Sequence, residues 1–87
     1  SMKVFVRLMG KILKDSDIHE FWFSLNDGAS LADLLKIMEE KKGLKIDVEE
    51  HPIIFINNLL TNLPEGLNAQ LKDLDKIIIM SPAIAGG

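Results

Sequence analysis

The end of the chain carries the group best placed to do chemistry, the carboxylate of Gly87. It follows Gly86, and the stretch before them, Ser-Pro-Ala-Ile-Ala, is uncharged and mostly small. Because glycine has no Cβ, Gly86 and Gly87 can pass through a narrow channel and bend inside the active site of another protein. We predict that the rest of the chain is a scaffold that presents this carboxylate to a partner.

Three further residues shape this tail. Pro82 ends the preceding strand because it has no N–H to donate to a sheet. Ala85 keeps the segment slim, and Ile84 is the bulky residue expected to anchor it against a channel wall. Nothing in the sequence here would fold the segment back, so we predict a domain over 1–81 and a flexible tail over 82–87.

The other side chains show no sign of a catalytic site of the chain's own. The sequence has no cysteine, which excludes a thiol nucleophile and a cysteine-based metal site. His19 and His51 lie far apart without ligand spacing, so no metal site is predicted. The acidic pairs Glu39-Glu40 and Glu49-Glu50 are expected on a solvated face. There is no glycine-rich phosphate loop, so we predict no bound cofactor, and any ATP would belong to a partner.

Composition indicates one small globular domain. The chain has 87 residues, 47% of them hydrophobic and 26% charged, with a net charge of -3. An acidic chain without a basic patch is not expected to bind nucleic acid, and no apolar run is long enough to span a membrane. The lack of cysteine favours a reducing cytoplasm. Ser1 before Met2 resembles the residue that tag cleavage leaves.

Alternating hydrophobicity predicts an N-terminal hairpin. Lys3–Met9 alternates between apolar and mixed positions, and 20–25 does the same, so both are expected to be half-buried strands. Gly10 would turn the chain, and 11–20 would form a polar connection.

One amphipathic helix is predicted over 30–42. Ser30 and Asp33 have the spacing of a capping box, and Gly43 can take the left-handed conformation that ends a helix. The apolar stripe that would face the sheet consists of Leu31, Leu34, Leu35 and Met38.

The second half of the chain predicts three more strands. They are 53–56, a short edge strand near 59–63 after the turn Asn57-Asn58, and 77–80. Leu67 and Leu71 are expected to close the open end of the core. The order β-β-α-β-β-β with one helix on one face predicts an α+β domain of the ubiquitin-like β-grasp type, with a mixed sheet of four to five strands.

The sheet face turned away from the helix is the second candidate site. If Val4 and Val6 point at the helix, then Phe5 and Trp22 point to solvent. In the last strand either Ile78 with Met80 or Ile77 with Ile79 points the same way. We take Phe5, Trp22, Ile78 and Met80, with the tail residues Pro82, Ile84 and Ala85, as candidates for binding a partner.

These features together resemble the MoaD/ThiS family of ubiquitin-like sulfur-carrier proteins, over essentially the whole chain. The resemblance rests on the order of elements, on Ile-Asn-Asn at 56–58 where relatives usually have Val-Asn-Gly, on the segment 71–75, and on Pro82 followed by the terminal Gly86-Gly87. Leu74 departs from the family, which usually has glycine between the two acidic residues.

The resemblance implies a sulfur carrier rather than a self-sufficient enzyme. A MoeB/ThiF-like adenylating enzyme would use ATP to activate Gly87, and a sulfur donor would convert it to a thiocarboxylate. Chain length and Pro82 favour the MoaD-like branch, in which the tail enters the large subunit of molybdopterin synthase and supplies sulfur for molybdenum (or tungsten) cofactor. In that case the chain would be the small subunit of the synthase.

Three alternatives stay open at this point. A ThiS-type carrier would deliver sulfur to thiazole synthase for thiamine. A ubiquitin-like modifier would pass the activated Gly87 to a lysine and form an isopeptide bond. A plain interaction module would leave the tail unused.

Overall fold

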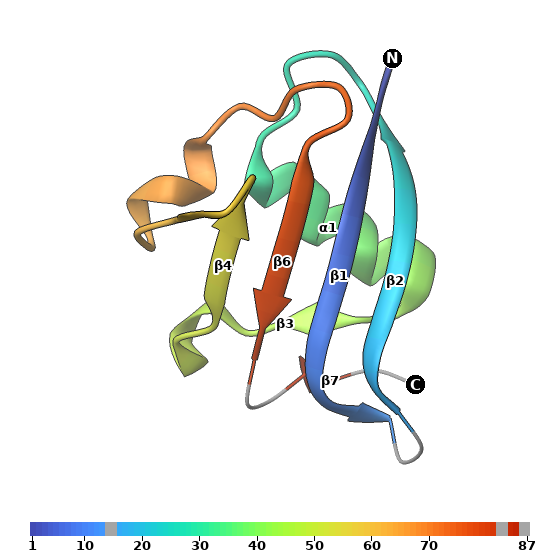
Figure 1. Cartoon of the computed structure of the whole chain (residues 1–87), viewed down its shortest axis with the longest axis vertical. Helices are drawn as coiled ribbons and strands as arrows, with labels where there is room; N and C mark the ends of the chain where they lie inside the picture. Colours follow the sequence, from blue (N-terminus) through green and yellow to red (C-terminus); the bar gives the residue numbers. More distant parts are fainter. Residues whose placement is uncertain (14–15, 82–83, 86–87) are drawn as a thin grey trace.

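A mixed five-stranded sheet forms the body of the protein (Figure 1). The computed structural model describes residues 1–13, 16–81 and 84–85, and of 11–13, 16–17 and 84–85 the backbone alone. The strands lie in the order β2 (Ser16–Leu25), β1 (Met2–Leu13), β6 (Lys76–Met80), β4 (Ile53–Ile56) and β5 (Leu59–Leu60). β1 and β6 are parallel, and the other neighbouring pairs are antiparallel.

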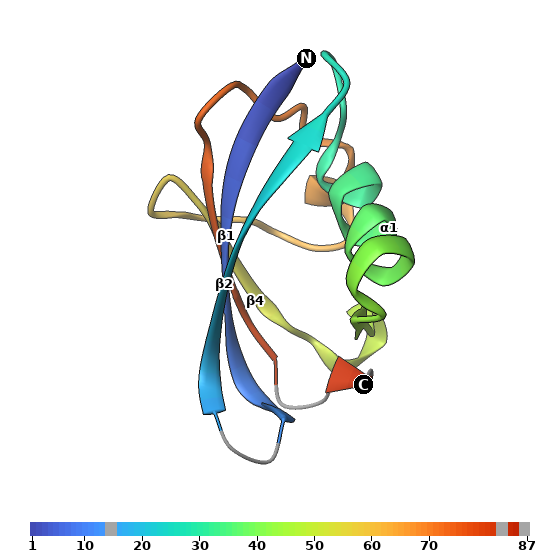
Figure 2. The same ribbon diagram turned by 90° about the vertical axis from the view of Figure 1, so that its right-hand side faces the viewer.

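The helix α1 (Leu31–Lys42) covers one face of this sheet (Figure 2). Its start is the predicted capping box: the Ser30 N–H donates to the Asp33 carboxylate, and the Asp33 N–H donates to Ser30 Oγ at 3.2 Å. The first of these bonds is the main cause that lowers the pKa of Asp33 from its ordinary value. Gly43 ends the helix in the left-handed conformation, at φ 67°. The predicted α+β architecture, a β-grasp with one helix on a mixed sheet, is confirmed.

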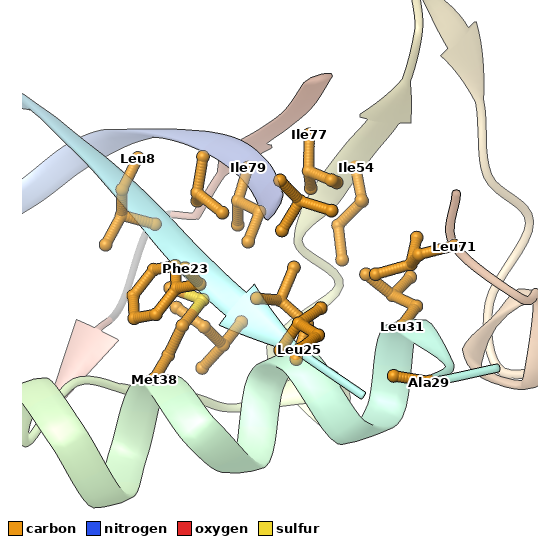
Figure 3. Packing of buried hydrophobic residues seen from close by; sticks show 14 of the residues in the cluster. Leu8, Phe23, Leu25, Ala29, Leu31, Met38, Ile54, Leu71, Ile77 and Ile79 are labelled. Atoms are coloured by element: carbon orange, nitrogen blue, oxygen red, sulfur yellow. The ribbon is translucent and has the colours of Figure 1, made fainter. Parts of the chain in front are cut away.

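The core lies between α1 and the sheet (Figure 3). Its fully buried side chains come from alternate positions of the central strands and from one stripe of the helix, and they are Val4, Val6, Leu8, Leu31, Leu34, Met38, Ile54, Ile77 and Ile79. Leu71 is buried at the end of this layer and Leu67 packs against it, as predicted. Because Ile77 and Ile79 point inward, Ile78 and Met80 point to the other face.

Two parts of the chain differ from the prediction, the end of the N-terminal hairpin and the strand β3 (Lys45–Ile46) after α1. The N-terminal hairpin continues to the pair Leu13–Ser16, where the sequence suggested a long polar connection. After α1 the sequence predicts a polar connection over 44–50 with room for a short turn. Lys45–Ile46 in this segment forms the strand β3, and Val48–Glu50 forms a 3-10 turn. A second 3-10 turn spans Glu65–Asn68. A period-2 pattern cannot be recognised in two residues, which explains why β3 was missed.

Gly10 lies inside β1 rather than in a turn, and its lack of a side chain is required there. Its φ is 143°, and a Cβ at this position would collide with the carbonyl oxygen of Ser81. The Ser81 N–H donates to the Met9 carbonyl at 3.1 Å, which fixes this close approach. The start of the tail is therefore held against β1 by backbone contacts.

A buried carboxylate fixes the segment before β6. Asp75 accepts from Asn57 Nδ2 at 2.7 Å and from the Lys72 N–H at 2.8 Å. Asn57 Oδ1 in turn accepts from the Lys76 N–H. The Asn57-Asn58 turn and the Asp75 segment, both part of the family resemblance, thus hold each other in place.

Leu74 adopts a backbone conformation that suits glycine. Its φ is 67°, in the left-handed region, and its side chain is largely exposed. We expect Leu74→Gly to raise the free energy of unfolding by about 1 kcal/mol, because relief of the left-handed strain outweighs the added freedom of the unfolded chain. Urea denaturation measures this change. Asn58→Gly is the matched control at φ 70°, where asparagine is already tolerated, and an equal gain in both variants would contradict the strain at Leu74.

Candidate functional site

An apolar surface covers the sheet face opposite α1, and we call it the open-face patch. The strand register sets its members side by side across four strands of the sheet. They are Phe5 and Met9 of β1, Ile18 and Trp22 of β2, Ile78 and Met80 of β6, and Ile53 and Phe55 of β4, with Leu60 of β5 at the edge. Exposed apolar residues gathered over this many strands are typical of a docking surface.

The aromatic end of the patch is formed by Phe5 and Trp22. They are cross-strand partners with ring centroids 5.3 Å apart and an interplanar angle of 55°. Trp22 is 59% exposed, although an indole is among the side chains most costly to leave in water. Leu74 lies beside Trp22, and the two side chains line a hollow together with Lys3 and Ser24. Trp22 therefore has the position of an interface anchor rather than of a core residue.

The opposite end of the patch forms a hollow at the base of the tail. Met9, Met80 and Ile53 are direct neighbours in the register, and with His51 and Ser81 they line a cavity of about 480 Å³. Ile53 is 47% exposed, and methionine side chains adapt readily to a partner surface. The patch thus reaches the residue from which the tail leaves the sheet.

One ion pair crosses the middle of this apolar surface. Arg7 and Glu20 are cross-strand partners, with Arg7 Nε donating to Glu20 Oε2 at 2.9 Å and Arg7 Nη2 at 2.8 Å from the same oxygen. Both side chains are partly exposed, so the pair adds little to stability. Any partner that covers the patch would have to accommodate these two charges.

The structure brings the four predicted sheet residues together. Phe5, Trp22, Ile78 and Met80 all lie in the open-face patch, with Ile78 and Met80 on the outward side of β6. Pro82, Gly86 and Gly87 lie outside the described residues, so their roles stay predictions. The same holds for the proposed side-chain role of Ile84.

The expectation that nothing in the tail folds back is corrected at two residues. Ile84–Ala85 forms the short strand β7, which pairs antiparallel with β3, Ile84 opposite Ile46 and Ala85 opposite Lys45. The physical reason is that β3 offers an unpaired strand edge, a feature that the sequence did not reveal. The division into a domain over 1–81 and a tail over 82–87 stays a prediction.

Sequence reasoning missed five members of the patch, namely Met9, Ile18, Ile53, Phe55 and Leu60. The signal was present for Met9, because it continues the outward alternation of Phe5 and Arg7. For Ile53 and Phe55 the signal was the uniformly apolar run 53–56 in a domain with one helix. Such a strand must turn half of its side chains to the uncovered face.

Two absences bear on other kinds of site. Within residues 1–13, 16–81 and 84–85, no group of three or more histidine or acidic side chains is arranged to hold a metal ion. No helix in the same part of the chain is both long enough and apolar enough to cross a membrane.

Comparison with solved structures gives two relevant likenesses. The chain is 32% identical to one in the protein–protein complex of subunits 1 and 2 of molybdopterin-converting factor from Helicobacter pylori 26695, with a TM-score of 0.60 over 99% of this chain and 100% of that one. It is 20% identical to a Haloferax volcanii protein solved in solution, with a TM-score of 0.58 over 98% of this chain and 88% of that one, a likeness of fold. Neither a scan against protein-family models nor a search of curated proteins gives a match.

The first likeness spans the β-grasp sheet, the helix and the tail-bearing end of the chain at an identity that establishes kinship. Together with the β-grasp fold, this identity over the whole chain shows the family. The chain belongs to the MoaD/ThiS family of ubiquitin-like sulfur-carrier proteins, and within it is MoaD-like.

Proposed function

We propose that this protein is the sulfur-carrying small subunit of a molybdopterin synthase. The observation that carries the proposal is the likeness over the whole chain to a protein solved in the complex of the two subunits of molybdopterin-converting factor. The open-face patch supports it, since an apolar surface that ends at Ser81 can bind a partner whose active site receives the tail.

The proposed chemistry takes place at the carboxylate of Gly87. A MoeB/ThiF-like enzyme joins a carboxylate oxygen to the α-phosphate of ATP, which releases pyrophosphate and leaves an acyl adenylate. Sulfide from a donor attacks the acyl carbon, and AMP leaves as the C–O bond breaks. The sulfur of the resulting thiocarboxylate adds to an electrophilic carbon of the molybdopterin precursor held by the large subunit, which forms a thioester. Water then breaks the acyl C–S bond, so that the sulfur stays on the precursor as a thiol and the Gly87 carboxylate is restored. The chain itself supplies position and access, and the ATP belongs to its partner.

Intact-mass analysis tests this chemistry. The protein is incubated with ATP, a sulfide source and the cognate adenylating enzyme, and it should gain the mass difference between one sulfur and one oxygen at Gly87. The charged product is then offered separately to the molybdopterin synthase large subunit and to thiazole synthase. Discharge by the large subunit supports the proposal, whereas discharge by thiazole synthase alone, or no mass change with an enzyme active on another carrier, would reject it.

The open-face patch gives a second prediction. Trp22→Lys should weaken binding to the large subunit about 30-fold, because a charge replaces an exposed aromatic anchor. The free energy of unfolding should fall by about 1 kcal/mol or less, since the main loss is the contact with Phe5. Calorimetric titration and urea denaturation measure the two effects.

Ser24→Lys is the matched control for this variant. Ser24 is exposed on the same strand and the same face as Trp22, two residues closer to the end of β2. It should bind the large subunit with nearly the parent affinity. Equal weakening by both variants would mean that added positive charge, not the indole, decides the result.

A further inference from the structure

We propose that the pairing of β7 with β3 is a latch that holds the tail away from partner enzymes in the resting protein. The inference rests on the proposed function and adds a regulation to it. The latch consists of two residue pairs, Lys45 opposite Ala85 and Ile46 opposite Ile84, in an antiparallel ladder separate from the main sheet.

β3 is the fixed half of the latch. Gly43 turns the chain at the end of α1, and the Leu44 N–H donates to the Met38 carbonyl at 3.3 Å. Leu44 and Ile46 are both buried in the core on either side of the exposed Lys45. The edge that receives the tail is therefore built into the folded domain and does not depend on a partner.

The latch limits how far the Gly87 carboxylate can reach. Under the proposed function the reacting carboxylate is that of Gly87, two residues beyond Ala85. An extended chain spans at most about 3.5 Å per residue, so the paired tail can place Gly87 no more than about 7 Å beyond Ala85. Measured from Ser81, which backbone contacts fix against β1, six free residues can reach about 20 Å. A recessed active site that must also enclose Ile84 and Ala85 can be reached in the open form alone, because these two residues are paired with β3 in the closed form.

The latch also directs the tail away from the docking surface. β7 lies on the α1 side of the sheet, near the C-terminal end of the helix (Figure 2). The open-face patch lies on the opposite face, as the strand register shows. A partner bound to Met9, Ile53 and Met80 would contact the base of the tail. The paired residues Ile84 and Ala85 would lie on the other side of the sheet from this partner. Docking and tail entry are therefore separate events, joined by the opening of the ladder.

Two residue pairs make a weak ladder, which is what a reversible latch requires. Two-stranded pairings of this length are marginal in water, and among the described residues β1 is the other strand that β7 lies close to. Contacts that a partner makes with the released tail favour the open state, so binding shifts the population toward it. The closed state keeps the tail from enzymes that have not docked on the patch.

A disulfide across the ladder tests the inference. In the double variant Lys45→Cys with Ala85→Cys, opposed residues of an antiparallel pair have Cα atoms about 4.5 to 5.5 Å apart, within the range that a disulfide accepts. The chain has no native cysteine, so the product is unambiguous. The adenylating enzyme's ATP–pyrophosphate exchange is the readout, since it needs no sulfide that would reduce the bond.

The oxidised variant should support exchange at least ~10-fold more slowly than the same protein after reduction, while the parent protein should not respond to reductant. Equal rates for both forms, with the disulfide confirmed by mass, would overturn the latch alone. No exchange with the parent protein would overturn the proposed function and the latch with it.

Nuclear magnetic resonance on the parent protein gives a test without any change in the tail. Hydrogen-bonded and non-hydrogen-bonded pairs alternate along an antiparallel ladder, so one of the two pairs brings its Hα atoms close together. The free protein should show this Hα–Hα contact, and it should disappear when the large subunit is added. A contact that is absent from the free protein, or that persists in the complex, would overturn the latch.

Discussion

Removing Gly87, or adding one alanine after it, is expected to abolish thiocarboxylate formation and to leave the free energy of unfolding within about 0.5 kcal/mol of the parent value. Under the proposed mechanism the reacting atom is the terminal carboxyl carbon. A deletion withdraws it by one residue, or about 3.5 Å, and an addition places a Cβ where glycine is needed. Intact mass after incubation with ATP, sulfide and the adenylating enzyme measures the first effect, and urea denaturation measures the second.

The same alanine placed before Ser1 is the matched control. Ser1 is exposed, and its amino group forms a surface ion pair with Asp27 at 3.5 Å, a contact of small energy. This variant should form the thiocarboxylate at the parent rate. Activation of the protein that lacks Gly87 would contradict the proposed mechanism, and a large loss of stability on its removal would show a structural role for the end of the tail.

Gly10→Ala is expected to lower the free energy of unfolding by about 3 kcal/mol, a large share of the total for a domain of this size. The new Cβ would collide with the Ser81 carbonyl oxygen, and alanine is strained at a φ of 143°. Relief of the collision must move Ser81 away from Met9, which also shifts the base of the tail. We therefore expect slower thiocarboxylate formation even under conditions where the variant is fully folded.

Gly28→Ala distinguishes the effect of backbone strain from the effect of the collision with Ser81. Its φ of 84° also disfavours alanine, but among the described residues no atom outside Gly28 and its two chain neighbours lies within 4 Å of the added Cβ. The loss should be about 1 kcal/mol, which is the backbone strain alone. Similar losses for Gly10→Ala and Gly28→Ala would mean that Ser81 can move aside freely and that the tail base is not fixed.

The parts of the fold that carry strong local signals could be predicted from the sequence. The helix was predicted with both ends because Ser30, Asp33 and Gly43 each act through backbone hydrogen bonds within one turn. The sequence signals for the strand over 53–56 and for the turn after it are also local, since Asn57 and Asn58 tolerate the positive φ that the turn requires. The candidate residues Phe5 and Trp22 followed from alternation along well-marked strands.

The remaining features depend on contacts between distant segments. The inward side of β6 could not be read from four consecutive apolar residues, and it is set by the pairing of Ile77 with Val6 and Ile56. The sequence suggests a turn at Gly10, whereas the structure requires glycine there because a Cβ would collide with the Ser81 carbonyl oxygen. Ser81 is far along the chain, so this requirement cannot be read from the residues around Gly10. β3 and β7 are two residues each and stabilise one another, so neither could be recognised alone.

The central place of β6 has a consequence for how the molecule is made. Among the five strands of the sheet it comes last in the chain, yet it lies between β1 and β4. Before Lys76–Met80 leaves the ribosome, the N-terminal hairpin and the β4–β5 pair have no strand to join them. A fold that depends on pairing segments distant in the sequence forms slowly. A chain that lacks β6 therefore cannot join the two halves of the sheet, and the open-face patch, which spans both halves, cannot form without it.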